Sequence, residues 1–320
     1  MDSRQDQLNA SRAAARLLPG DFAPSFRAPA LGGNPDYVFN SAAGRYILLL
    51  FFGSVAPDAS AAALRLIAGH RGLFDDQRAC FFGISCDPDD AAKGVIAQSL
   101  PGIRFFLDPR EEVSALYGAA DPKAGYDPHW LLLDRGLQVI GAYDIGDGAR
   151  VLSDLSALVT LPPIEYPAPV LVVPRLFEPE LCRYLVGLYE QAGGTESGFM
   201  REVDGRTVAM LDHSHKRRSD WTIEDDNLRR ALAARINRRL RPRIQHAFQF
   251  DATRLERYIV ACYESGVGGY FRPHRDNTTK GTAHRRFAVT INLNAEDYDG
   301  GDLRFPEYGD RTWRAPTGGA

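Results

Sequence analysis

The sequence predicts a two-domain protein in which an α/β half precedes an α+β half. The chain has 320 residues, which exceeds the size at which a single hydrophobic core usually stops growing. Residues 18–159 alternate short apolar runs with helical patterns, whereas the later residues place helices first and strands afterwards. Between the two halves, TLPPIEYPAPVLVVP carries five prolines, and such a density suits a linker. We therefore expect domains at residues 1–161 and 162–320.

The first half has the pattern of a sheet covered on both faces by helices. RYILLLFFG and ACFFGISCD are continuous apolar runs, which are typical of strands buried on both faces. Between them, ASAAALRLIAGHRGLF has helical spacing. Further along, EEVSALYG predicts a short helix that ends at Gly118, and HWLLLDRGLQVIGAYD predicts two strands around a turn at residues 134–136.

The second half begins with helices. FEPELCRYLVGLYEQAGG predicts an amphipathic helix with Leu181 and Leu185 on its apolar face and a Gly-Gly stop. REVDGRTVAML predicts a hairpin around Asp204 and Gly205. EDDNLRRALAARINRRL predicts a second helix, and LERYIVACYE, RRFAVTINLN, DLRF and TWRAP follow as predicted strands.

Composition and charge exclude several classes of protein. The 38 Lys and Arg residues nearly balance 41 Asp and Glu residues, so we expect no nucleic-acid partner, and we interpret the basic stretches at residues 216–218 and 229–243 as solvated surface. No apolar run is long enough for a signal peptide or a membrane span. The four cysteines form no CxxC pair, which fits a reducing compartment. We expect a cytoplasmic protein without a membrane partner.

Two histidine motifs could bind a metal. GGYFRPHRDN places His274 and Asp276 two positions apart, and in extended backbone such side chains project the same way. An imidazole and a carboxylate so placed match two of the three ligands of a non-haem iron facial triad. LDHSHKRRSDW offers His213 and His215 at the same spacing, but it lacks an acidic or cysteine partner at familiar spacing, and we interpret it as a solvated loop.

The context of His274 and Asp276 resembles a known family. YIVACYESGVGGYFRPHRD, followed by HRRFAVTINLNAEDYDGGDLRF, resembles the prolyl-hydroxylase-like iron(II)- and 2-oxoglutarate-dependent dioxygenases. The resemblance implies a double-stranded β-helix, which is a jelly-roll barrel, with supporting helices. It implies Fe(II), 2-oxoglutarate and O2 as cofactors, with ascorbate as a candidate reductant. It also implies His274 and Asp276 as iron ligands and Tyr263 as a contact of 2-oxoglutarate, although a strand tyrosine that packs on the barrel is an equal alternative.

The resemblance is incomplete in one respect. The family takes its third ligand, a histidine, and a basic residue for 2-oxoglutarate from later strands, whereas the last histidine here is His284 and the sequence stops at Ala320. We expect that the sequence is truncated and that the chain as given binds iron weakly. The alternative is a non-catalytic binding module. The substrate, a protein side chain or a small molecule, stays open, as does the oligomeric state.

The first half also resembles a family. LLPGDFAPSF and WLLLDRGLQVIGAY resemble the peroxiredoxin branch of the thioredoxin-like fold. In that branch a nucleophilic cysteine follows the strand that matches ILLLFFG and lies at a helix start, where its thiolate is stabilised. This sequence reads SVAPDASAAAL there and has no cysteine between Ile47 and Ala79. We expect a thioredoxin-like docking platform that reduces no peroxide, with Cys80 and Cys86 in its core.

Overall fold

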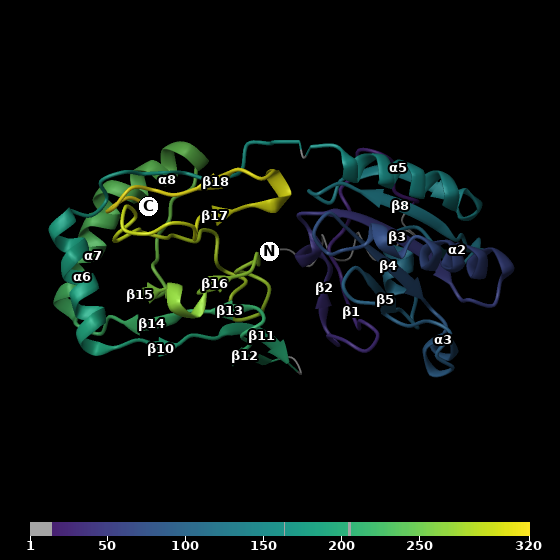
Figure 1. The fold of residues 1–320 in the computed structure, drawn as a ribbon, viewed down its shortest axis with the longest axis horizontal. Coiled ribbons are helices and arrows are strands. Elements are labelled where there is room, and N and C mark those ends of the chain that lie inside the picture. Colours follow the sequence, from purple (N-terminus) through teal and green to yellow (C-terminus); the bar gives the residue numbers. More distant parts are fainter. Residues whose placement is uncertain (1–14, 163, 204–205) are drawn as a thin grey trace. The chain divides into compact units, whose positions relative to one another are not determined.

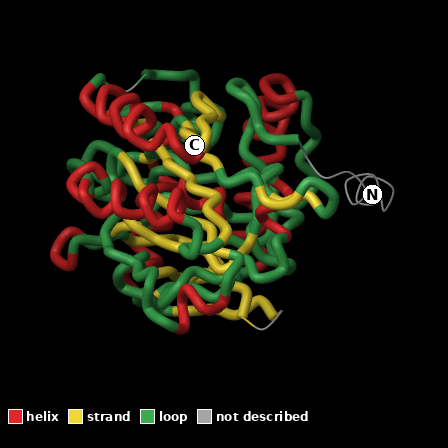
Figure 2. Tube along the Cα trace, turned by 90° about the vertical axis from the view of Figure 1, so that its right-hand side faces the viewer, coloured by secondary structure: helices red, strands yellow, loops and turns green. Residues whose placement is uncertain are grey.

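The computed structural model of the chain describes residues 15–162, 164–203 and 206–320, and Figure 2 draws the remaining residues in grey. The chain divides into two compact units, which are residues 1–166 with 306–310 and residues 167–305 with 311–320. The first change of unit therefore falls in the proline-rich segment. Across the described ranges, no helix combines the length and the apolar character that a bilayer crossing requires.

The first unit contains a five-stranded sheet of order β5-β4-β3-β8-β9 (Figure 1). Its strands are β3 (Tyr46–Gly53), β4 (Ala79–Ser85), β5 (Ile103–Leu107), β8 (His129–Leu133) and β9 (Val139–Asp144). β3, β4 and β5 are parallel, whereas β8 is antiparallel to β3 and to β9. The short strands are β1 (Arg27–Ala28), β2 (Tyr37–Val38), β6 (Ala120–Asp121) and β7 (Gly125–Tyr126). The helices are α2 (Asp58–Gly69), α3 (Pro88–Ala92), α4 (Glu112–Leu116) and α5 (Gly148–Thr160). This arrangement is thioredoxin-like, as the sequence predicts.

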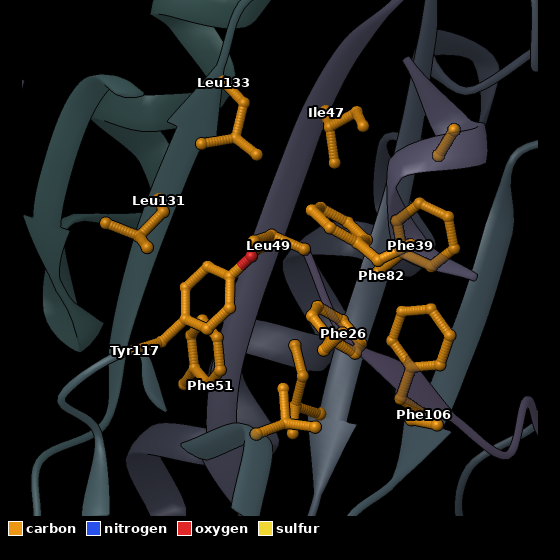
Figure 3. Packing of buried hydrophobic residues seen from close by; sticks show 14 of the residues in the cluster. Phe26, Phe39, Ile47, Leu49, Phe51, Phe82, Phe106, Tyr117, Leu131 and Leu133 are labelled. Carbon is orange, nitrogen blue, oxygen red and sulfur yellow. The ribbon is translucent and has the colours of Figure 1, made fainter. Parts of the chain in front are cut away.

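Strand β3 lies at the centre of the sheet, and its side chains alternate between two hydrophobic clusters. Ile47 and Leu49 face the cluster that Figure 3 shows, together with Tyr117 from the end of α4. Leu48 and Leu50 face the opposite cluster, to which α2 and α5 contribute. Because both faces are covered, every position from 47 to 52 is buried, and this explains why the run is apolar throughout rather than alternating.

The predicted turns of the first unit also form. The carboxylate of Asp134 accepts hydrogen bonds from the backbone N–H groups of Gly136 at 2.9 Å and Gln138 at 2.8 Å, which closes the β8–β9 connection. Gly118 follows α4 with a φ of 74°, a left-handed conformation that glycine adopts without steric cost. Local sequence signals therefore determine this connection and this helix end.

The second unit consists of three helices and several short strands joined by loops (Figure 1). The helices are α6 (Pro179–Ala192), α7 (Asp226–Arg235) and α8 (Arg241–Phe248), with a π-helical turn (Ile236–Leu240) between the last two. The strands are β10 (Thr195–Glu196), β11 (Phe199–Val203), β12 (Arg206–Met210), β13 (Lys216–Arg217), β14 (Ser219–Thr222), β15 (Ile259–Cys262), β16 (Tyr270–Phe271), β17 (Leu303–Arg304) and β18 (Thr312–Trp313). Leu185 of α6, Leu232 of α7, Ile244 of α8 and Val260 of β15 share its core.

The predicted barrel is not formed by the described residues. Their strands make one three-stranded sheet, β10-β14-β15, and the pairs β11-β12, β13-β16 and β17-β18. The jelly roll therefore stays a prediction from the family resemblance. The predicted hairpin is present as β11 and β12, but its turn at Asp204 and Gly205 lies outside the described residues.

The prediction of a strand at RRFAVTINLN is wrong for this structure. Within that segment, Asn292 exchanges backbone hydrogen bonds with Gly318 and Gly319, and residues 286–294 form no ladder with another described segment. Phe287 and Val289 of this segment are 37% and 43% exposed, whereas Ile291 and Leu293 pack against the core of the second unit. The physical reason is that alternation favours a strand, whereas a strand exists only where a neighbouring backbone supplies hydrogen-bond partners.

Candidate metal centre

Tyr263 directly follows β15 and lies next to a basic residue of the adjacent strand. β15 pairs antiparallel with β14, with Cys262 opposite Ser219, so the register places Arg218 beside Tyr263. The Arg218 guanidinium lies 5.8 Å from the centre of the Tyr263 ring, and Nη1 is 3.5 Å from the phenol oxygen. Tyr263 is 48% exposed. The Tyr263 side chain is thus half-exposed beside a guanidinium, and both its roles, a contact of 2-oxoglutarate and a packed barrel aromatic, stay predictions.

A tight glycine turn connects Tyr263 to β16. Gly268 has a φ of 62°, and the N–H of Gly269 donates to the carbonyl of Glu264 at 2.9 Å. A Cβ atom on Gly269 would lie 2.8 Å from the backbone of Tyr263, so this position requires glycine. The turn folds the chain back between β15 and β16, and β16 leads directly into the segment with His274 and Asp276.

His274 and Asp276 lie in a loop, and their donor atoms face each other. The Nδ1 of His274 is 2.7 Å from the carbonyl oxygen of Arg272, which leaves Nε2 directed at Asp276 Oδ1 at 3.4 Å. The Phe271 ring stacks on the imidazole with 3.6 Å between ring centres. The hydrogen bond from His274 holds the pKa of Asp276 below its usual range. A neutral imidazole nitrogen and an ionised carboxylate oxygen are the donors that non-haem iron prefers.

Arg285 and Glu256 brace this loop. Arg285 donates to both carboxylate oxygens of Glu256, from Nε at 2.6 Å and from Nη2 at 2.5 Å, and its Nη1 is 3.4 Å from the carbonyl oxygen of Asp276. The hydrogen bonds from Arg285 lower the pKa of Glu256. A charged bidentate pair of this kind restricts both side chains, so it ties the loop at Asp276 to the segment before β15.

The prediction of a solvated loop holds for His213 but is wrong for His215. His213 is exposed and lies 3.2 Å from Glu196, as expected for a solvated loop. His215 is instead half-buried, with its ring centre 4.5 Å from Phe199 and 6.3 Å from His274. Burial, and then the charge of His274, lower the pKa of His215. The pairing of β13 with β16 brings this imidazole to the site, and local sequence gives no signal for such a pairing.

The two predicted ligand atoms lie close together. Nε2 of His274 and Oδ1 of Asp276 are 3.4 Å apart, so both could contact one ion after a small adjustment of either side chain. Over residues 15–162, 164–203 and 206–320, however, no group of three His, Cys, Asp or Glu side chains has metal-binding geometry. His274 and Asp276 therefore stay a prediction for two ligands of a facial triad.

The first unit holds no cysteine at the start of α2. Its place after β3 is taken by Ser54 and Val55, and the N–H of Val55 donates to the two oxygens of the Asp90 carboxylate at 3.3 and 3.1 Å. Ser85 also donates to Asp90, at 2.8 Å, and Asp90 is 4% exposed. A buried carboxylate thus holds the loop in which a peroxiredoxin would carry its thiolate.

The cysteines of the first unit are poor nucleophiles. Burial raises the pKa of Cys80 to about 12 and that of Cys86 to about 11. Cys86 directly follows β4, and its sulfur lies 3.3 Å from the hydroxyl of Ser114 in α4. Because the thiolate is the reactive form, neither residue has the chemistry of a peroxidatic cysteine near neutral pH.

Residues 258–319 match the family model of the 2OG-Fe(II) oxygenase superfamily. The match lies within the second unit, apart from residues 306–310. The matched segment contains Tyr263, His274 and Asp276, and the superfamily in general uses Fe(II), 2-oxoglutarate and O2. No curated protein sequence matches the chain.

Solved structures similar to the chain include several thiol peroxidases. AhpC of Mycobacterium tuberculosis is 17% identical, covers 45% of this chain and 99% of its own, and has a TM-score of 0.37. A thiol peroxidase from Chromobacterium violaceum is 18% identical, with coverages of 45% and 89% and a TM-score of 0.35. A reduced 2-Cys peroxiredoxin of Plasmodium vivax is 15% identical, with coverages of 43% and 94% and a TM-score of 0.37.

Proposed function

We propose that the protein is an iron(II)- and 2-oxoglutarate-dependent dioxygenase that hydroxylates its substrate, similar to the prolyl hydroxylases. The observation that carries the proposal is the facing pair of donors, His274 Nε2 and Asp276 Oδ1, at 3.4 Å inside the segment that matches the oxygenase superfamily. The substrate is a protein side chain or a small molecule with a C–H bond that can be oxidised.

In this proposal the residues of the chain bind the metal and 2-oxoglutarate and orient them for the reaction. His274 and Asp276 hold the metal, and the contact of His274 Nδ1 with the carbonyl of Arg272 orients the ring with Nε2 toward Asp276, where a metal would replace their hydrogen bond. The phenol of Tyr263 contacts 2-oxoglutarate. Iron(II) bound at the pair supplies open coordination positions where 2-oxoglutarate and O2 meet and the C–H bond is oxidised. The brace of Arg285 and Glu256 keeps the Asp276 backbone in place.

The test is turnover of 2-oxoglutarate to succinate by the protein loaded anaerobically with iron(II). We expect that His274→Ala and Asp276→Ala each abolish turnover and leave the fold intact, because each removes a metal ligand from an exposed loop. A matched control is His213→Ala, which changes a histidine at the same spacing on the solvated loop. Unchanged turnover in both ligand variants would exclude this pair as the metal site.

A second candidate function is a non-catalytic binding module. The observation in its favour is that no group of three side chains with metal-binding geometry exists among the described residues. This candidate predicts that the protein binds neither iron(II) nor manganese(II) and forms no succinate, and that the Ala variants behave like the wild type in both assays.

For the thioredoxin-like half we propose a docking or substrate-presenting role. The absence of a cysteine between Ile47 and Ala79 and the raised pKa values of Cys80 and Cys86 support a role without redox chemistry. The proposed domain limits are residues 1–161 and 162–320. Deletion of residues 1–161 should then weaken the binding of a large substrate while 2-oxoglutarate still binds, and equal loss of both would contradict the docking role.

A further inference from the structure

His129 is a fully buried histidine with one ring nitrogen that lacks a hydrogen-bond partner. It is the first residue of β8, its exposed fraction is 0%, and its ring stacks on Phe51 with 5.2 Å between ring centres. Nδ1 lies 2.8 Å from the carbonyl oxygen of Asp127, so in the neutral ring Nδ1 carries the proton and Nε2 carries the lone pair. Within the described residues, no group donates a hydrogen bond to Nε2. A buried acceptor without a donor is uncommon and requires an explanation.

A buried donor without an acceptor lies close to this ring. Arg16 precedes β1, and its Nε–H has no hydrogen-bond acceptor in the described part of the chain. The Nη1 of Arg16 is 2.7 Å from a carboxylate oxygen of Asp144 and 4.0 Å from one of Asp127. Asp144 is the residue of β9 opposite His129, and the carbonyl of Asp127 contacts the His129 ring. Both contacts therefore hold the guanidinium near the imidazole.

Arg16 belongs to a segment that lies along β9 and that we call the N-terminal strap (residues 15–23). The N–H of Gly20 donates to the carbonyl of Val139 at 2.8 Å, so the strap continues the sheet at this point. Beside residues 140–144 of β9 both segments are described, and no backbone hydrogen bond joins them. A hollow of about 440 Å³ lies between them instead. The ion pair of Arg16 therefore holds this part of the strap to the sheet.

Protonation of His129 would place two donors and two positive charges together. The neutral ring has a lone pair at Nε2, whereas the protonated ring carries an N–H group at both nitrogens. In a buried position the new charge would repel the Arg16 guanidinium. Burial lowers the pKa of His129 most, and the charge of Arg16 lowers it further. The backbone hydrogen bond and the carboxylate of Asp127 and the carboxylate of Asp144 oppose this shift but do not cancel it.

We propose that His129 and Arg16 form a pH-sensitive latch, which holds the N-terminal strap on β9 while His129 is neutral and releases it when His129 is protonated. A released histidine has a pKa of about 6.5, and the pKa in the held state is lower. The held state is therefore fully favoured above about pH 6.5 and loses stability as the pH falls below that value. Release frees the outer edge of β9, and a free edge can pair with another strand. The latch does not depend on the proposed metal centre.

The test is hydrogen–deuterium exchange of the full chain between pH 5 and 8, measured by mass spectrometry and corrected for the intrinsic exchange rate at each pH. Peptides of the strap report release, and peptides of β3 report unfolding of the whole sheet. We expect constant protection of the strap above about pH 7. Below about pH 6.5 its protection should fall by up to about tenfold per pH unit, while β3 stays protected.

Three variants identify the groups involved. His129→Gln replaces the ring by an uncharged amide and should make the protection of the strap independent of pH. His70→Gln changes the other histidine of the first unit, which is exposed at the end of α2, and should behave like the wild type. Arg16→Gln should lower the protection of the strap at pH 8, because the ion pair with Asp144 is lost.

Two results would overturn the latch. One is a strap whose protection does not change between pH 5 and 8 in the wild type, and the other is the same pH dependence in wild type and His129→Gln. If His129→Gln does not fold, which circular dichroism shows, the wild type and His70→Gln decide. Simultaneous loss of protection in the strap and in β3, or a pH dependence that His70→Gln removes, then overturns the proposal.

Discussion

The two units of this chain differ in how their strands are specified. In the first unit β3 and β4 have eight and seven residues and are buried along almost their whole length. Around the candidate metal centre β13 and β16 have two residues each. Continuous apolar runs with helices on both faces fold into a sheet from nearby sequence signals. A barrel depends on strand pairs between segments far apart in the chain. The alternation of apolar and polar residues within one segment does not specify which distant strand it pairs with.

The units also differ in how they treat buried charged groups. In the first unit the Asp90 carboxylate is satisfied by Val55 and Ser85. In the second unit Lys216 is buried and has only neutral hydrogen-bond partners, and His274 faces Asp276 at an open loop. Residues that do not suit their local surroundings, such as buried polar groups without charged partners, are common where proteins bind ligands. We therefore expect substitutions in the first unit to change mainly stability, and the following predictions test this contrast.

The largest effect is expected from a core truncation in the first unit. Phe82 is fully buried and stacks on Phe106, so Phe82→Ala should lower the free energy of unfolding by about 3–5 kcal/mol. Phe287→Ala in the second unit removes a ring that is 37% exposed and should cost less than about 1 kcal/mol. Urea denaturation followed by tryptophan fluorescence measures both. Equal losses would contradict the contrast between the two units.

An intermediate effect is expected at Asp76, a carboxylate that receives Arg104 in a bidentate pair at 2.6 and 2.7 Å. Burial raises the pKa of Asp76, but the hydrogen bonds and charge of Arg104 and the charge of Arg45 outweigh it, so the net pKa is lowered. Asp76→Asn should therefore destabilise by about 1–3 kcal/mol near neutral pH.

The pKa of Asp76 is lower in the folded state than in the unfolded state. Its contribution to the free energy of unfolding is therefore fully present above the unfolded pKa of about 3.9, and it is lost as the pH falls through the folded-state pKa. The difference in the free energy of unfolding between wild type and Asp76→Asn should therefore disappear below about pH 4. Urea titrations at several pH values would measure this difference. Asp251→Asn, in the exposed pair with Arg241 of the second unit, should leave stability unchanged. A pH-independent gap at Asp76 would contradict the role of its charge.

The smallest effect is expected on the rate at which the protein consumes hydrogen peroxide. Since burial raises the pKa of Cys86 to about 11, the thiol is neutral near pH 7 and should neither react quickly with iodoacetamide nor reduce hydrogen peroxide. Peroxide consumption should stay at the buffer rate, even with a thioredoxin system present. Efficient consumption that disappears in a Cys80→Ser, Cys86→Ser double variant would show that the first unit is a peroxidase.

The sequence by itself determined the first unit and the proximity of His274 and Asp276. Apolar runs such as residues 47–52, helix patterns and turn signals at Asp134 and Gly118 act over short distances, so they could be interpreted without a structure. The spacing of His274 and Asp276 similarly placed two donors on one side.

Tertiary structure alone decided what surrounds them. The burial of Lys216 and His215 follows from the pairing of β13 with β16, and the brace between Glu256 and Arg285 joins residues 29 positions apart. Such contacts arise when distant segments meet, and the free energy that selects them comes from burial and pairing of whole elements, which no local pattern records.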